Sequence, residues 1–192
     1  MIQQEKINQI NATASQRCAT ALSKLLNTKV EVIFSQPLIT DIKKISLAVD
    51  SQKIGTGIYL PISGDVSGSA LLLFSKETAA HLCDVMIKKE PQSTRELSSF
   101  DKEMLKEAGN ILLGNYLAVL SNSLRVEFIE GMPKLSFGMF GAILQEIVTN
   151  IAKSAEEAMM VRLEFILPSL RIRGYLLLLF SPGRIEPLLN AL

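Results

Sequence analysis

The sequence is poor in the residues that most often build catalytic or metal sites. Its 192 residues include only two cysteines, Cys18 and Cys83, and a single histidine, His81. Each cysteine lies alone in a helix-like segment without CxxC spacing, which favours small buried hydrophobic residues over a disulfide or a metal site. His81 has no nucleophile near it in the sequence, so we expect a capping or surface role. P-loop, GxSxG and HExxH motifs are absent, as is any carboxylate cluster with ligand spacing.

Neither the charge nor the hydrophobic runs point to nucleic acid or a membrane. The formal net charge is +1 and no basic stripe carries interleaved aromatic residues, which argues against a nucleic-acid partner. The longest apolar run, residues 175–180, is far too short to span a membrane, and the N-terminus lacks the apolar core of a signal peptide. We therefore expect a compact cytoplasmic protein without membrane insertion.

One stretch combines a strong helical pattern with residues that helices disfavour. Apolar residues at spacings of three and four predict a long helix that ends near Ser123, with one wide buried face. Ser98 and Asp101 predict a capping box at its start. The residues expected on the buried face are Phe100, Met104, Leu105, Ala108, Ile111, Leu112, Leu117, Leu120 and Leu124.

The opposite face of this helix carries Glu103, Glu107, Asn110 and Gly114. Steps of four, three and four residues stack them one turn above the next, so Glu107 and Asn110 can touch the same bound object. Gly114, one turn further on, has no side chain to keep that object away. A glycine inside a helix costs about 1 kcal/mol relative to alanine. Helix propensity therefore does not explain Gly109, Asn110 and Gly114.

The spacing of these residues resembles a known family signature. Glu107-x-x-Asn110 is followed after 22 residues by Pro133, within KEAGNILLGNYLAVLSNSL and then MPKLSFGMFGAIL. This pattern resembles the CheC/CheX/FliY phosphatase family of bacterial chemotaxis and is most similar to the second half of CheC. The signature is Asp or Ser, three residues, Glu, two residues, Asn, 22 residues, Pro. Glu103 departs from it at the first position.

The resemblance implies a substrate, a response regulator of the CheY type phosphorylated on an aspartate. The acyl phosphate is already held beside Mg²⁺ in the regulator, so the phosphatase is expected to need no cofactor of its own. Asn110 would position the attacking water, and Glu107 would pair with the active-site lysine of the regulator. Pro133 is interpreted as a rigid element that bounds the site.

Two other interpretations remain open. The first is a non-catalytic adaptor of the same fold that docks on a response regulator, a flagellar switch protein or a CheD-like deamidase. The second is a structural protein whose exposed helix mediates homodimerisation through Leu112, Leu113 and Tyr116 beside Gly114.

The rest of the chain predicts a mixture of helices and strands. Further helices are expected at residues 3–26, 76–88 and 138–153 and from residue 184. The first four strands, at 29–34, 41–51, 55–62 and 69–75, are expected to form an antiparallel meander. Later strands are expected at residues 125–129, 159–167 and 171–180.

Two pairs of similar segments predict an internal duplication. ATALSKLL at 19–26 aligns with LAVLSNSL at 117–124, and GSALLLFS at 68–75 aligns with GYLLLLFS at 174–181, at offsets of 98 and 106. We therefore expect a single CheC-like domain of residues 1–192, made of repeats at about 1–92 and 97–192. The expected fold class is α+β with pseudo-twofold symmetry, a mainly antiparallel sheet and two long helices on one face.

The duplication also indicates which half carries the site. The alignment places Gln9 where Glu107 stands and Ala12 where Asn110 stands, so the first helix lacks the polar pair. Shifting the alignment by one residue would use Asn8 and Asn11, again without the carboxylate. We therefore predict one active face, on the second long helix.

Overall fold

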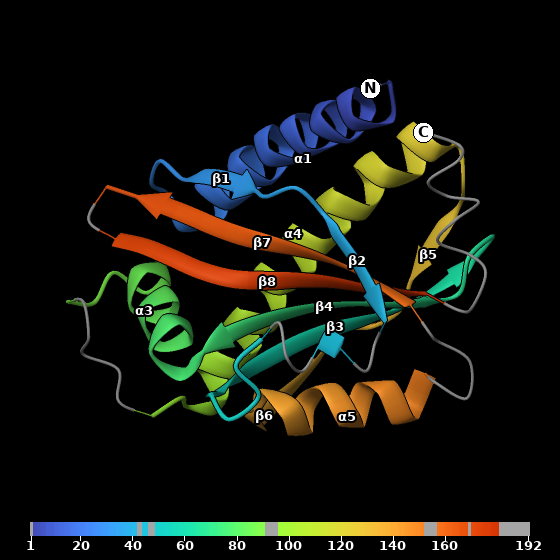
Figure 1. Ribbon diagram of the computed structural model, residues 1–192. Coiled ribbons are helices and arrows are strands. Elements are labelled where there is room, and N and C mark those ends of the chain that lie inside the picture. The colour runs from blue at the N-terminus through green and yellow to red at the C-terminus, as the bar shows by residue number, and fades with distance from the viewer. Residues whose placement is uncertain are drawn as a thin grey trace.

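The computed structural model describes residues 2–41, 44–45, 49–90, 96–151, 157–168 and 170–180. Helices cover both faces of one sheet (Figure 1). The helices are α1 (Ile2–Leu26), α3 (Lys76–Met86), α4 (Ser99–Leu124) and α5 (Phe140–Ile151). The strands are β1 (Glu31–Phe34), β2 (Leu38–Asp41), β3 (Ile54–Gly64), β4 (Gly68–Ser75), β5 (Phe128–Glu130), β6 (Lys134–Met139), β7 (Glu157–Leu167) and β8 (Leu170–Phe180).

The sheet interleaves strands from the two halves of the chain. Its order is β1-β7-β8-β4-β3-β5, with β2 also paired to β7 and β6 also paired to β3. All of these pairings are antiparallel in the described part of the chain. At the central β4–β8 contact Leu71 lies opposite Leu177, the residue that the offset of 106 makes its counterpart. The expected α+β fold class with a mainly antiparallel sheet is confirmed, whereas the assignment of one domain with two repeats stays a prediction.

Two expectations for the first half are wrong. The first four strands do not form a meander, because β1 and β2 both pair with β7 of the other half. The strand expected at 41–51 is not formed either: Asp41 ends β2, residues 44–45 are helical and 49–52 form a turn. Ile45 and Val49 are both buried in the core on the α5 side.

The second half holds one strand that the sequence did not predict. β6 lies in a stretch interpreted as a loop and the start of a helix, and α5 begins only at Phe140. The other predicted helices and strands agree with the structure to within a few residues of their ends. The helix expected from residue 184 lies outside the described residues.

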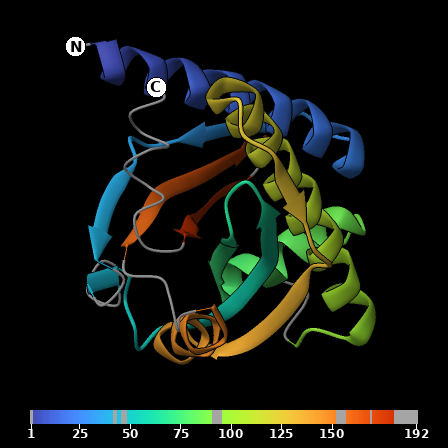
Figure 2. The same ribbon diagram turned by 90° about the vertical axis from the view of Figure 1, so that its right-hand side faces the viewer.

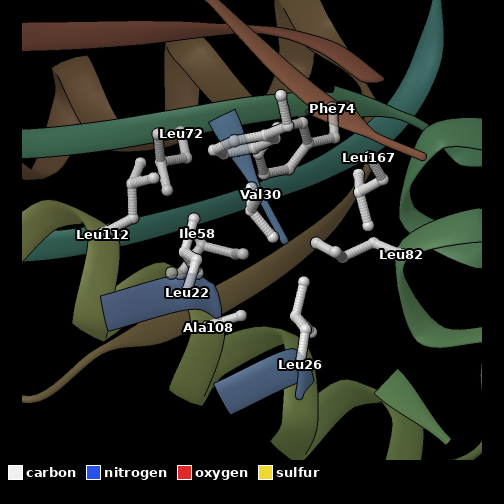
Figure 3. Close-up of a pocket in the computed structure, with 12 residues that line it drawn as sticks. Leu22, Leu26, Val30, Ile58, Leu72, Phe74, Leu82, Ala108, Leu112 and Leu167 are labelled. Carbon is white, nitrogen blue, oxygen red and sulfur yellow. The ribbon is translucent and has the colours of Figure 1, made fainter. Parts of the chain in front are cut away.

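The two long helices, α1 and α4, pack side by side on one face of the sheet, as expected (Figure 1). α3 joins them over the larger apolar core, and α5 covers a smaller core on the opposite face. Side chains from α1, α4 and β3 meet in the larger core, among them Leu22, Leu112 and Ile58 (Figure 3). The cavity that these side chains line together with their neighbours has a volume of only about 10 Å³, hardly enough for one water molecule. α4 therefore rests on a close-packed, rigid support.

Candidate functional site

Both ends of α4 are fixed by local interactions. The Asp101 N–H donates to Ser98 Oγ at 3.2 Å, and the Ser98 N–H donates to the Asp101 carboxylate at 2.8 Å. This reciprocal pair is the capping box that the sequence predicted. At the other end Arg125 adopts a left-handed conformation with a φ of 56° and stops the helix. A helix fixed in this way holds the side chains on its outer face in constant positions.

The outer face of α4 begins one turn earlier than the sequence predicted. Phe100 was placed on the buried face, but 64% of its surface is exposed. Phe100, Glu103, Glu107 and Asn110 follow one another at steps of three, four and three residues, which places them on a single face. Glu103 and Glu107 are exposed and Asn110 is partly exposed. We call these four residues, together with Gly114, the outer stripe.

The two glycines of the segment have different structural causes. A Cβ on Gly109 would lie 2.7 Å from Ile58 Cγ2, so Gly109 lets α4 approach the sheet. A Cβ on Gly114 would lie 3.0 Å from Glu130 Oε2 and 3.5 Å from Oε1. The expectation that Gly114 leaves open space for a bound object is therefore wrong, because the carboxylate of Glu130 fills that space. Neither cause applies to Asn110.

The polar residues of the stripe differ in whether they have partners. Glu103 Oε1 lies 2.6 Å from Lys106 Nζ, one turn along the helix. Within the described residues, no hydrogen bond or ion pair engages the side chain of Glu107 or Asn110. The structure thus brings these two together as free groups on adjacent turns, and it ties Glu103 to a neighbouring lysine.

The connection between β5 and β6 borders this face of α4. Figure 2 shows β5 running alongside the helix, and Glu130, the last residue of β5, reaches Gly114. The Gly131 N–H donates to the Pro61 carbonyl at 2.8 Å and holds the connection against β3. Pro133 follows it, partly buried, immediately before β6. Pro133 therefore lies in the segment that flanks the outer stripe, and its bounding role stays a prediction.

Glu130 is the residue of this region that the sequence did not single out. It falls inside the 22-residue interval between Asn110 and Pro133, which was treated as spacing alone. Glu130 as a whole is exposed, but its carboxyl group is partly shielded from water where it lies against Gly114. This partial burial raises the pKa of Glu130 above the ordinary value. The local sequence gives no signal for it, because its contact with Gly114 depends on how β5 is placed beside α4.

The first long helix offers no equivalent pair. Gln9 and Ala12 are exposed where Glu107 and Asn110 would be expected. Asn11 is only 7% exposed; its amide donates to the Ser35 carbonyl at 2.9 Å, and its oxygen accepts from the Tyr116 hydroxyl at 3.3 Å. The alternative alignment through Asn8 and Asn11 therefore does not yield a free amide, because Asn11 is part of the core.

The structure also bears on the cysteines, the proposed homodimer surface, metal sites and membrane-spanning helices. Cys18 and Cys83 are buried free thiols, as expected. Leu112, Leu113 and Tyr116 are all buried, so the homodimer surface proposed from them is wrong. Among the described residues, no three His, Cys, Asp or Glu side chains are grouped so that they could hold a metal ion. No helix in the described ranges is long and apolar enough to cross a membrane.

Comparisons with known proteins agree with this fold. No protein-family model matches the chain. The chain is 25% identical over 163 residues to the CheY-P phosphatase CheC of Bacillus subtilis (strain 168), covering 83% of this chain and 78% of that protein. Among solved structures it superimposes on Thermotoga maritima FliY with a TM-score of 0.80 at 18% identity, covering 99% and 95% of the two chains.

A third similarity is to a chain in a solved complex of two proteins. The chain matches one in the FliG-FliM complex from H. pylori with a TM-score of 0.67 at 14% identity, covering 98% of each chain. Together these findings confirm the resemblance to the CheC/CheX/FliY family that the motif indicated. In sequence the chain is similar to CheC, and in fold it is similar to FliY.

Proposed function

We propose that this protein hydrolyses the aspartyl phosphate of a CheY-type response regulator, with the outer stripe of α4 as the active face. The observation that carries the proposal is the pair Glu107 and Asn110, which project from a rigid helix without a partner in the described residues. The neighbouring glycines, Gly109 and Gly114, are explained by their contacts with Ile58 and Glu130, whereas Asn110 has no such explanation. Similarity to a protein named CheY-P phosphatase supports the same reaction.

The chemistry requires one oriented water molecule. In the reaction, the oxygen of the water attacks phosphorus, the bond from phosphorus to the aspartate oxygen of the regulator breaks, and inorganic phosphate leaves. The Asn110 amide presents donors and an acceptor at fixed geometry and would align this water. Such alignment contributes up to several kcal/mol to catalysis in favourable cases. Mg²⁺ and the acyl phosphate belong to the regulator in this scheme.

Glu107 would fix the register of the two proteins. Its carboxylate lies one helical turn before Asn110 and is not neutralised, whereas Glu103 is paired with Lys106. A cation on the partner, in this proposal the active-site lysine of the regulator, would form a charge-assisted hydrogen bond with it. Phe100, exposed at the start of the stripe, would add apolar contact area to the same interface.

A second candidate function is a non-catalytic adaptor. The ion pair that occupies Glu103 and the absence of a polar pair on α1 favour it. The fold similarity to a chain of the FliG-FliM complex supports docking on a flagellar switch protein. A CheD-like partner remains part of this alternative.

The test is the decay of a phosphorylated CheY-type regulator with and without this protein and its Glu107→Ala and Asn110→Ala variants. We expect Asn110→Ala to reduce the accelerated decay about a hundredfold while it still binds the regulator, because only the water would be misplaced. Glu107→Ala should mainly weaken binding. Binding of the phosphorylated regulator without any acceleration by the unaltered protein would establish the adaptor instead.

A further inference from the structure

We propose that Glu130 adds a carboxylate from outside α4 to the active face and accepts the proton of the attacking water. This inference rests on the proposed phosphatase function. It starts from the contact between β5 and α4, which places a carboxyl group from outside the helix on the same stripe as Asn110.

The geometry is set by Gly114. Asn110 and Gly114 are four residues apart on one helix face, where Cβ positions lie about 5–6 Å from each other. The oxygens of Glu130 lie 3.0 and 3.5 Å from the Cβ position of residue 114. The carboxylate thus stands where the side chain of the next turn would be. A water molecule held by the Asn110 amide would have Glu130 on its C-terminal side along the helix.

The backbone of Glu130 is held more firmly than that of a residue in a free loop. Glu130 pairs with Ile62 in the sheet, and the following Gly131 N–H bonds to the Pro61 carbonyl at 2.8 Å. Its carboxylate has no hydrogen-bond or ion-pair partner in the described part of the chain. A fixed backbone with an unengaged carboxylate is the arrangement that a proton acceptor needs.

The surroundings make this carboxyl group a better base than an ordinary glutamate. Charged residues on the elements around it are Lys106 and Glu107 on α4, Asp65 and Glu127 at the ends of β3 and β5, and Lys134 on β6. The pKa of Glu130 is raised by burial, with no contribution from these charges. Catalytic bases work best when their pKa lies close to the operating pH.

The step conserves atoms and charge. The water oxygen forms its bond to phosphorus, the bond to the aspartate of the regulator breaks, and that aspartate leaves as a carboxylate. The proton released by the water passes to Glu130 and is then exchanged with solvent. Asn110 orients the water in this step, and Glu130 takes its proton.

The experiment measures the accelerated decay of the phosphorylated regulator from about pH 5 to about pH 9, with the decay of the regulator alone subtracted. The full chain is compared with Glu130→Gln, with Gly114→Ala and with Glu127→Gln. Glu127 is the matched control, because it is an exposed carboxylate immediately before β5. Binding of the beryllofluoride form of the regulator and thermal unfolding are followed for each variant.

We expect Glu130→Gln to lower the maximal rate about tenfold or more without changing binding or unfolding. The rate of the unaltered protein should fall at low pH as Glu130 takes up a proton, at a higher pH than the ordinary glutamate value of about 4.3. That dependence should vanish in Glu130→Gln and remain in Glu127→Gln. Gly114→Ala should also lower the rate, because its methyl group would displace the carboxylate.

Two results would overturn the inference and they are distinguishable. Unaltered rate and pH dependence in Glu130→Gln would remove Glu130 from the mechanism and leave the phosphatase function standing. Absence of acceleration by the unaltered protein at every pH would refute the phosphatase function and the role of Glu130 together.

Discussion

At the scale of single residues, Gly109, Asn110 and Gly114 are all disfavoured in a helix, but they have different explanations. Gly109 is small because Ile58 lies beneath it, and Gly114 is small because Glu130 lies beside it. The Asn110 side chain has no hydrogen-bond or ion-pair partner in the described residues. This is the basis for the proposal that Asn110 acts on a bound partner.

Replacing Gly109 with alanine tests whether the contact with Ile58 requires a glycine at this position. The new Cβ would lie 2.7 Å from Ile58 Cγ2 and 3.2 Å from Ile58 Cβ, which cannot move without shifting the strand. We expect a loss of about 1–3 kcal/mol in the free energy of unfolding, although alanine is the better helix former by about 1 kcal/mol. Urea denaturation measures this change in the free energy of unfolding.

Gly114→Ala is the matched control, because its neighbour is the mobile end of the Glu130 side chain. Its stability should stay within about 1 kcal/mol of the unaltered protein or rise. Equal destabilisation by both substitutions would show that the contacts at Gly109 and Gly114 do not differ as described.

At the scale of elements, sequence periodicity predicted what depends on neighbours in the chain. The helices at α1, α3 and α4 and the capping box at Ser98 follow from spacing and from local hydrogen bonds, and they were predicted closely. The β1–β7 and β3–β6 pairings join residues far apart in the chain, so no local pattern reveals them. The same limit explains why Glu107 and Asn110 could be found from their spacing and Glu130 could not.

The contact between the two long helices yields a test of the role of Asn11. Replacing Asn11 with alanine would leave the Ser35 carbonyl and the Tyr116 hydroxyl without their partner. We expect a loss of about 1–3 kcal/mol in unfolding free energy, with phosphatase turnover per folded molecule unchanged. Thr13→Ala, at an exposed position of the same helix, should change stability by less than about 0.5 kcal/mol. A turnover defect in a stably folded Asn11→Ala protein would argue for a functional site on α1.

At the scale of the whole molecule, the sheet interleaves strands from the two halves of the chain. β1 and β2 complete the sheet at β7, while β5 and β6 complete it at β3, so each half depends on strands of the other. The two buried thiols both lie in the first half, on α1 and α3, and each donates to a backbone carbonyl of α4 in the second half, Cys18 to Leu112 and Cys83 to Asp101. Burial raises the pKa of Cys18 to about 12, and burial with a smaller effect of Asp101 and Asp84 raises that of Cys83 to about 12.

We expect both thiols to be inert toward a disulfide reagent in the native protein near pH 8 and to react together on unfolding. The unfolded chain ionises them from about pH 8.5, whereas the native chain keeps them protonated. Their contribution to stability is therefore complete below that pH and is lost as the pH rises toward 12. Uptake of the disulfide reagent by the native protein checks that the thiols are inert. The free energy of unfolding, measured as a function of pH, checks the loss of stability at high pH. Reaction of one thiol well before global unfolding would show that α1 or α3 separates from α4 before the rest of the fold opens.

The central claim is that Asn110 orients the water that hydrolyses the aspartyl phosphate of the regulator. The most direct measurement is the decay rate of a phosphorylated CheY-type regulator with the unaltered protein, with Asn110→Ala and with Asn122→Ala, which changes an exposed asparagine of the same helix. We expect faster decay with the unaltered protein and with Asn122→Ala. With Asn110→Ala the acceleration should fall about a hundredfold despite retained binding. Equal acceleration by all three proteins, or binding without acceleration by any of them, would contradict it.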